Sequence, residues 1–253
     1  MLAIEFRLKI SSMYSIRVPY SYQCARTYPL PAPSTIKGLC ANALWRKEGG
    51  NPVELMKAIH DASLGATSRA EQSIAVSSCT IRVVPMNALL RQFAFTPFID
   101  CMIAFKDGSE DLGNKIAEGL KVSPVYLGDS ESLVSVLPES VNTDAQISPV
   151  NKNDEVEVNT LVKFDFIKNN SINEKGVVLY MQDDPCSADA VLERYIAPLK
   201  QQGDSYSPIE VFSFMVSKNC FVVEGKRLKG IFCKIQKEEP PKQKTKRTRK
   251  KKT

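Results

Sequence analysis

Side chains that suit single-stranded RNA gather in one short segment near the N-terminus. Tyrosine rings stack on bases, and arginine guanidinium groups contact phosphates or stack in the same way. The segment supplies both kinds of side chain in Arg17, Tyr20, Tyr22, Arg26 and Tyr28. The tyrosines also fit ordinary packing at the end of a strand, so these residues alone leave both interpretations open.

The residues that follow predict the positive end of a helix. Alternating prolines keep the chain extended up to Pro33, and Ser34 is the expected N-cap of a helix that stops at Gly49. Unpaired N–H groups of the first turn, the hydroxyls of Ser34 and Thr35 and the ammonium of Lys37 would then surround a site for an anion such as phosphate. A serine that only caps the helix explains Ser34 as well.

A second candidate region is the stretch IRVVPMNALLRQFAF, in which Arg82 and Arg91 flank a proline-containing connection. It predicts either an extended hairpin or a linking helical turn. Its mixture of apolar side chains with arginine indicates a surface that is buried only in an assembly, whereas a plain connection between strands is the alternative. Further on, Gly128 would permit a left-handed turn that approaches a ligand, or an ordinary turn before a strand.

Catalytic chemistry has few candidate residues. Metal-free RNA cleavage needs a base near the 2′-hydroxyl, usually His, Lys or Tyr. His60 is the single histidine, and it lies near the end of an expected helix, where an imidazole commonly caps or packs. No Walker loop, HExxH or Gly-x-Ser-x-Gly motif is present, which disfavours nucleotide hydrolysis, zinc proteolysis and esterase chemistry. A non-catalytic protein is therefore expected, with a metal-independent endoribonuclease that uses Tyr or Lys as the alternative.

The cysteines and the apolar pattern indicate a cytoplasmic protein. Seven cysteines are scattered without a Cys-x-x-Cys pair, so we expect reduced structural thiols and neither a metal site nor a cofactor. No run of eighteen apolar residues exists, and the first residues alternate polar with apolar. This pattern predicts no membrane segment and no export signal.

The net charge of +6 is concentrated at the C-terminus. The last residues, PPKQKTKRTRKKKT, hold eight of the 34 Lys and Arg residues and none of the 28 acidic residues, so the rest of the chain carries a net charge of −2. A run of like charges without apolar residues cannot pack. It is either a solvated tail or a non-specific contact to a polyanion.

The elements that must position these residues indicate an α+β protein without internal repeats. Apolar and polar residues alternate over residues 2–10, which predicts a half-buried strand. The later patterns predict helices over 34–48, 52–63 and 109–120, strands over 73–84 and 97–105, and a turn followed by a strand over 123–137. This order is the split β-α-β pattern of a ferredoxin-like (RRM-like) unit, whose antiparallel sheet commonly binds single-stranded RNA.

The chain is expected to divide into four parts. A ferredoxin-like unit would cover residues 1–138, a polar linker 139–154, a β-rich C-terminal half 155–237 and a disordered basic tail 238–253. The β-rich half is predicted from strand-like runs such as GVVLYMQ, IEVFSFMV and NCFVV.

Two motifs resemble a known family. The stretch YSYQCARTYPLPAPSTIKGLCANALWR after a short strand is similar to the CRISPR-associated Cas five family of the RAMP superfamily, in its type I-A form, and SPVYLGDSESLVSV strengthens the similarity. The motifs cover about forty residues strongly and residues 1–137 loosely. The C-terminal half matches only in position, and the basic tail lies outside the family pattern.

The resemblance implies a subunit of the antiviral Cascade surveillance complex, a cytoplasmic ribonucleoprotein. Such subunits hold the 5′ handle of the CRISPR RNA (crRNA) and contact the first backbone subunit and the large subunit, and they meet target DNA through the complex. Tyr20, Tyr22, Arg26, Ser34, Thr35 and Lys37 would then contact the handle. A thumb hairpin near residues 82–97 would grip the guide and the neighbouring subunit.

Overall fold

The computed structural model describes residues 1–21, 24–83, 87–129, 132–168, 172–187, 189 and 191–233. The side chains of residues 81–89 lie outside this description. In the described part of the chain, no helix has the length and apolar character needed to cross a membrane.

A five-stranded sheet forms the centre of the N-terminal half. Its strands are β1 (Leu2–Lys9), β3 (Ser63–Ala70), β6 (Phe98–Phe105), β7 (Val125–Tyr126) and β8 (Leu133–Val136). They lie in the order β3-β6-β1-β8-β7, and each pair is antiparallel. Helices follow β1 and β6, so the order β8-β1-β6-β3 is that of a split β-α-β unit.

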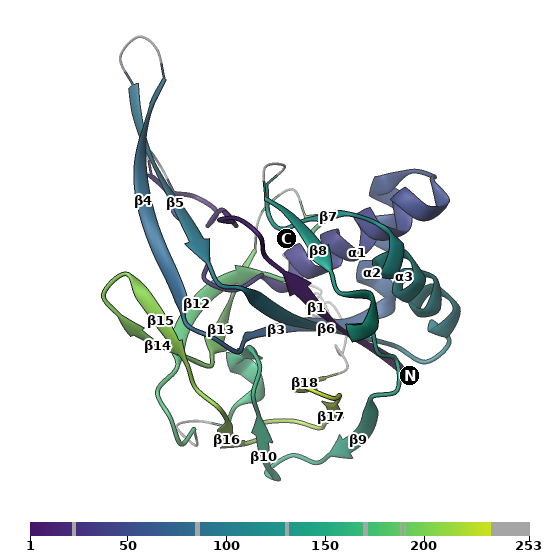
Figure 1. Cartoon of the computed structure of the whole chain (residues 1–253). Coiled ribbons are helices and arrows are strands. Elements are labelled where there is room, and N and C mark those ends of the chain that lie inside the picture. The colour runs from purple at the N-terminus through teal and green to yellow at the C-terminus, as the bar shows by residue number, and fades with distance from the viewer. Residues whose placement is uncertain are drawn as a thin grey trace, which may run out of the picture.

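Three helices cover one face of this sheet (Figure 1). They are α1 (Pro33–Glu48), α2 (Pro52–Ala62) and α3 (Glu110–Val122). The alternation along β1 explains the packing, because Ile4, Phe6 and Leu8 all point into the core that also contains Ile36 and Leu44 of α1.

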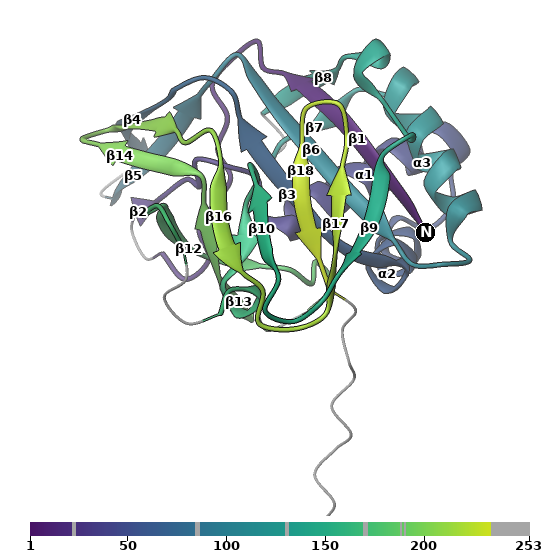
Figure 2. The same ribbon diagram turned by 90° about the horizontal axis from the view of Figure 1, so that it is seen from below.

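The opposite face of the sheet is covered by strands from the C-terminal half (Figure 2). They are β9 (Gln146–Val150), β17 (Cys220–Glu224) and β18 (Lys229–Phe232), in the order β18-β17-β9. A second core of Ala3, Met102, Ala104, Val223 and Phe232 joins the two sheets. This face, which commonly binds single-stranded RNA in ferredoxin-like units, is packed against protein here.

A buried carboxylate fixes this packing. Glu5 of β1 is fully buried on the covered face. It accepts hydrogen bonds from the backbone N–H groups of Lys226, Arg227 and Leu228, at 2.8, 2.8 and 2.9 Å. A Cβ at Gly225 would lie 2.6 Å from a carboxylate oxygen of Glu5, so the turn between β17 and β18 approaches β1 as closely as a glycine allows.

An extended hairpin projects from the molecule (Figure 1). It consists of β4 (Ile74–Val83) and β5 (Asn87–Phe95), which pair from Ala75 with Phe95 to Val83 with Asn87. The sheet order β14-β15-β4-β5-β2 adds β2 (Cys24–Ala25), β14 (Leu199–Gln202) and β15 (Ser205–Pro208). The sequence left a hairpin or a helical turn open here, and the structure has the hairpin.

The rest of the C-terminal half is built from short strands around a third core. β10 (Glu155–Val158) pairs with β16 (Phe212–Met215), and β13 (Leu192–Ala197) lies between β11 (Val162–Lys163) and β12 (Val177–Gln182). Two 3-10 turns, η1 (Pro138–Ser140) and η2 (Phe164–Phe166), complete the elements. The predicted α+β class and the β-rich second half are confirmed.

Two expectations about the elements need correction. The second strand of the central sheet is β3, whereas residues 73–84, expected there, form the hairpin strand β4. The sequence of β3, SLGATSRA, has Leu64 as its one large apolar residue, so its pattern did not predict a strand. In addition, the expected linker 139–154 contains β9, which pairs with β17. The basic tail 238–253 lies outside the described residues.

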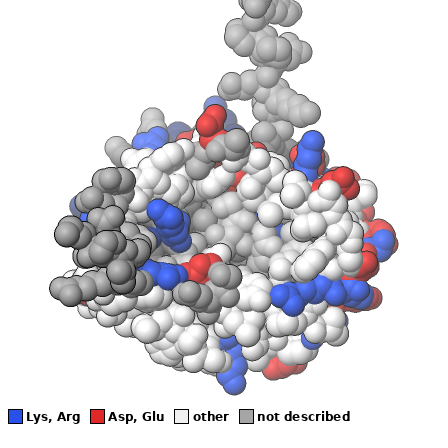
Figure 3. Space-filling view, turned by 90° about the horizontal axis from the view of Figure 1, so that it is seen from above, with Lys and Arg blue, Asp and Glu red and all other residues white. Residues whose placement is uncertain are grey.

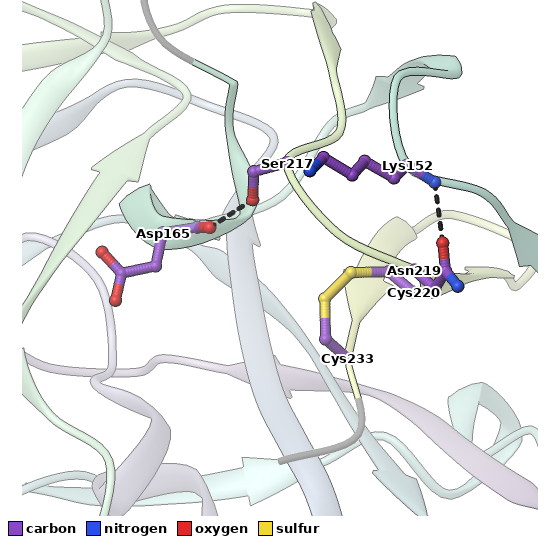
Figure 4. Close-up of a disulfide and its surroundings, with 6 residues drawn as sticks. All are labelled: Lys152, Asp165, Ser217, Asn219, Cys220 and Cys233. Carbon is purple, nitrogen blue, oxygen red and sulfur yellow. Dashed lines mark hydrogen bonds between the residues drawn. A yellow bond between two sulfur atoms is a disulfide. The ribbon is translucent and has the colours of Figure 1, made fainter. Parts of the chain in front are cut away.

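The expectation that all cysteines are reduced is also wrong. A disulfide joins Cys220 and Cys233, 13 residues apart in the chain (Figure 4). Phe221 of β17 pairs with Phe232 of β18, so the two cysteines lie directly opposite each other at the open end of the hairpin. The register of two strands brings them together, and no short Cys motif signals it.

Candidate nucleic-acid interface

A cavity of about 240 Å³ opens at the first turn of α1. The extended segment around Arg17 forms one wall, Ser34 and Thr35 form the helix end, and Gly128 and Asp129 form the opposite wall. Cavities that enclose whole small ligands measure roughly 300–1,000 Å³. This smaller cavity therefore suits one group of a larger polymer, such as a backbone phosphate.

The helix end offers hydrogen-bond donors to the cavity. The N-cap is Ala32, with Pro33 as the first helical residue and no side-chain cap. The prediction of Ser34 as N-cap is therefore wrong by two positions, because the fixed φ of Pro33 and its missing N–H suit the first helical position. The N–H groups of Ser34 and Thr35 have no intrahelical acceptor, and both side chains are half-buried at the cavity.

The opposite wall depends on a glycine. Gly128 has φ +91°, and a Cβ there would lie 2.5 Å from the carbonyl oxygen of Ser15. The two residues form a parallel bridge, so Gly128 lets the turn close against the extended segment. The turn also carries Asp129, whose carboxylate accepts hydrogen bonds from Ser132 at 2.6 and 3.0 Å and pairs with Arg91 of the hairpin.

The guanidinium of Arg91 therefore forms an ion pair with the carboxylate of Asp129. The guanidinium also lies 4.8 Å from the ring centroid of Phe93. This pairing joins the projecting hairpin to the cavity wall and neutralises a carboxylate that would otherwise repel phosphate. Arg82 lies on β4, and its side chain is outside the described residues.

Tyr28 does not fit the predicted stacking role. Its side chain is 4% exposed, and its hydroxyl donates a hydrogen bond to the backbone oxygen of Tyr180. Burial raises the pKa of Tyr28 to about 12. The ring is thus a packed part of the cavity floor, because the proline-rich segment presses it against β12.

Lys37 does not face the cavity. Only 1% of its side chain is exposed, and its ammonium donates to the carboxylate of Asp183 at 2.9 Å, to the backbone oxygen of Asp183 at 3.1 Å and to Nδ1 of His60 at 3.2 Å. The predicted phosphate contact is wrong, because the ammonium of Lys37 is buried and donates to internal acceptors.

The remaining predicted residues lie at the surface around the cavity. Arg17 lines the cavity and is exposed. Tyr20, three residues after Arg17, has φ +60° and is 75% exposed. Arg26 is exposed near Tyr206, where its charge partly offsets the burial that raises the pKa of that tyrosine. Tyr22 lies outside the described residues.

Sequence reasoning thus found one wall and, of the opposite wall, only the left-handed turn at Gly128. Arg17, Ser34 and Thr35 meet at the cavity as expected, whereas Asp129, Ser15 and Gln182 were not predicted to line it. The glycine followed by aspartate at positions 128–129 was a usable signal for a tight turn. Seen from above, the molecule is hollowed beside Lys and Arg side chains (Figure 3).

The N-terminal part of the sequence matches a known protein family. Residues 4–84 match the family described as CRISPR-associated protein (Cas_Cas5). This N-terminal part of the chain is therefore similar to the CRISPR-associated Cas5 family. The matched residues include β1, α1 and the cavity residues Arg17, Ser34 and Thr35.

A solved structure shares the fold of this protein. A crystal structure of a CRISPR protein from Archaeoglobus fulgidus superimposes with a TM-score of 0.60 at 13% identity, covering 92% of this chain and 99% of that chain. A chain of a CRISPR RNA-guided surveillance complex gives a TM-score of 0.41 at 13% identity, covering 81% of this chain and 90% of that chain, which is too low to argue a shared fold. No curated protein matches the sequence significantly.

Proposed function

We propose that this protein is a Cas5 protein and a non-catalytic subunit of a type I-A Cascade surveillance complex in antiviral defence. In this proposal it holds the 5′ handle of the crRNA at the α1 cavity, caps the backbone next to the large subunit and meets target DNA only through the complex. The observation that carries the proposal is the cavity itself, in which free helix amides and an exposed Arg17 converge within the family-matched region.

The cavity chemistry suits a backbone contact. The two N–H groups of Ser34 and Thr35 lie at the positive end of a helix of 16 residues, where an anion is favoured. Arg17 adds a charged donor from the facing segment. In guide-RNA complexes, base pairing reads the sequence while protein holds backbone and shape, so a site that grips phosphate without reading a base is what a handle-binding subunit needs.

The projecting hairpin suits contact with the guide and neighbouring subunits. Residues 77–80 of β4 are all exposed. On β5, the apolar side chains of Leu90 and Phe95 are 37% and 40% exposed on either side of Arg91. Apolar groups displayed on an extended arm gain from burial when a partner covers them.

The environment of His60 favours a structural role. Its Nδ1 faces the ammonium of Lys37, and its Nε2 lies 3.7 Å from the carboxylate of Asp184. Both ring nitrogens are therefore directed at groups of the protein. A general base needs a free nitrogen within hydrogen-bond reach of the substrate hydroxyl.

Handle binding is tested with the protein and RNA derived from the CRISPR repeat of its own genome. The double variant Arg17→Ala/Arg26→Ala should weaken binding and make the log–log salt slope shallower by about 0.7 for each phosphate that the protein no longer neutralises. The matched control is Lys115→Ala/Lys200→Ala, which removes two exposed charges from α3 and β14. Equal slopes and affinities for the two double variants would remove the cavity from the RNA site.

The non-catalytic role has its own test. The purified protein, incubated for hours with repeat RNA in chelator, should leave the RNA intact, and so should His60→Ala and Tyr20→Phe. A positioned base typically contributes about 10²- to 10⁴-fold in rate, so even weak cleavage would be visible. Specific cleavage by the wild type that either change abolishes would establish the endoribonuclease instead.

A further inference from the structure

The outer face of the β12–β13 pair is exposed beside the α1 cavity. Along β12, the side chains of Leu179 and Met181 pack into the core, whereas those of Val178 and Tyr180 are 49% and 55% exposed. Successive side chains of a strand point to opposite faces, so Gln182 lies on the same face as Tyr180, one repeat of about 7 Å further along. Gln182 lines the α1 cavity. The exposed face of β12 therefore begins where the cavity ends.

An arginine stands opposite the exposed tyrosine. Arg194 of β13 pairs with Tyr180 in the ladder, and directly opposed side chains lie on the same face of a sheet. Arg194 is exposed, and its guanidinium lies 4.4 Å from the ring centroid of Phe164. The neighbouring Glu193 pairs with Lys163, and among the described residues no carboxylate lies at ion-pair distance from Arg194. The ring holds one face of the guanidinium, and the N–H groups at the guanidinium edge can contact a phosphate.

Two contacts fix β12 to the residues around the cavity. The hydroxyl of Tyr28 donates a hydrogen bond to the backbone oxygen of Tyr180. The ammonium of Lys37 donates to the backbone oxygen and to the carboxylate of Asp183, at 3.1 and 2.9 Å. These contacts lie on either side of Gln182 in the sequence. The strand therefore meets the cavity in a fixed position, and side chains on a rigid strand are held more precisely than side chains on a loop.

We propose that the outer face of β12–β13 binds the single-stranded RNA that enters the α1 cavity, with Tyr180 stacking on a base and Arg194 contacting a phosphate. The inference rests on the proposed function, because RNA in the cavity brings the strand to Gln182. An exposed aromatic ring beside a cationic group is the combination that holds single strands without reading their sequence. A protein partner would also bury Val178 and Tyr180, but the uncompensated charge of Arg194 favours a polyanion.

The test measures the affinity of the full chain for repeat-derived RNA. Tyr180→Leu keeps an apolar side chain and removes the ring, so affinity should fall about fivefold or more while the log–log salt slope stays unchanged. Trp45→Leu is the matched control, because Trp45 is 40% exposed near the opposite end of α1, and it should bind as the wild type does. Arg194→Ala should make the salt slope shallower by about 0.7, whereas Lys115→Ala should leave it unchanged. Thermal unfolding checks that each variant is folded.

A photochemical cross-link locates the stacked base directly. 5-Iodouridine is placed at one position of the repeat RNA at a time, and the irradiated complex is digested and analysed by mass spectrometry. We expect one position to cross-link to the peptide that contains Tyr180. This cross-link should be lost in Tyr180→Leu and should persist in Trp45→Leu.

Two outcomes would overturn the proposal. The first is equal RNA affinity, salt slope and cross-linking for the two variants of the outer face and their controls, with weaker binding by Arg17→Ala/Arg26→Ala showing that RNA still occupies the cavity. The second is unchanged RNA binding by Tyr180→Leu together with weaker association with the other subunits, which would identify the face as a protein interface. If instead Tyr180→Leu and Arg194→Ala weaken binding and Arg17→Ala/Arg26→Ala does not, the outer face is supported and the cavity is removed from the RNA site.

Discussion

Two hairpins of this protein have opposite attachments. The β17–β18 hairpin is held at both ends, by Glu5 at its turn and by the Cys220–Cys233 disulfide at its open end. The β4–β5 hairpin is attached at its base and through the pairing of Arg91 with Asp129, and residues 77–80 are exposed on both faces.

This difference indicates that the β17–β18 hairpin stabilises the fold, whereas the β4–β5 hairpin is available for contact with a partner. Buried charge, close backbone approach and a covalent bond are concentrated where the C-terminal half closes over the central sheet. Polar and half-exposed side chains are concentrated on the projecting arm, which can adapt to a partner at little cost to the core. Substitutions in the two hairpins should therefore change different measurements.

The largest effect is expected at Glu5. Glu5→Gln replaces a carboxylate that accepts three backbone hydrogen bonds by an amide whose NH₂ faces donors. The free energy of unfolding in urea should fall by about 3 kcal/mol or more, since charge-assisted bonds to buried groups are removed. Glu71→Gln is the control, because Glu71 is 55% exposed beside Arg7 and should cost less than about 1 kcal/mol. Similar losses of unfolding free energy for both variants would contradict a stabilising role of the Glu5 hydrogen bonds.

The disulfide should rank next. Cross-linking residues 13 apart removes chain entropy from the unfolded state, worth about 2–3 kcal/mol for a loop of this length. Dithiothreitol should lower the stability of the wild type by that amount and leave Cys220→Ala/Cys233→Ala unchanged. In hydrogen exchange, the loss should appear in β17 and β18 and not in β4 and β5. If all seven cysteines of the unfolded, unreduced protein react as free thiols, the disulfide is absent.

An effect of pH on stability, of intermediate size, is expected at Tyr28 in the floor of the α1 cavity. The pKa of Tyr28 is raised from 10.0 to about 12 by burial, so the folded state holds the phenol proton more tightly than the unfolded chain. Its contribution is complete below pH 10 and is lost as pH rises toward 12. Tyr28→Phe should cost about 1 kcal/mol at pH 8 and show a shallower loss of stability between pH 10 and 12. The exposed Tyr20→Phe should follow the wild-type profile.

The smallest effect on stability is expected at Arg91. Arg91→Ala removes the pairing of the arm with Asp129 and should change the free energy of unfolding by less than about 1 kcal/mol. The same variant should weaken retention of guide RNA by the assembled complex, because Asp129 is left unneutralised at the cavity. A loss above about 2 kcal/mol would mean that the arm is braced as firmly as β17–β18.

Local pattern predicted the parts of the fold that local physics decides. The alternation in β1, the helical spacing after Pro33 and the α2 and α3 segments all indicated the correct element. β1 was predicted to be half-buried, however, and it is buried on both faces. β3 was not predicted, since its small residues carry no period, and its burial is set by sheets on both sides. The disulfide was missed for a similar reason, because strand register brings the cysteines together.

The site was predictable to the same extent. Arg17, Ser34 and Thr35 lie close in sequence to the turn that joins them, so their convergence follows from one helix start. Lys37 and Tyr28 were misassigned because their partners, Asp183 and Tyr180, are about 150 residues away. A sequence pattern shows that a polar side chain exists and not which distant atom satisfies it.

The hydrogen bonds of Glu5 to the turn between β17 and β18 also limit when folding can be completed during synthesis. The partners of this carboxylate follow it in the chain by 221 to 223 residues. At roughly 5–20 residues per second, the first strand waits about 10–40 s before its charge can be enclosed. During that interval the face of the nascent sheet that carries Glu5 stays exposed to water, and it is covered only after β17 and β18 have been synthesised.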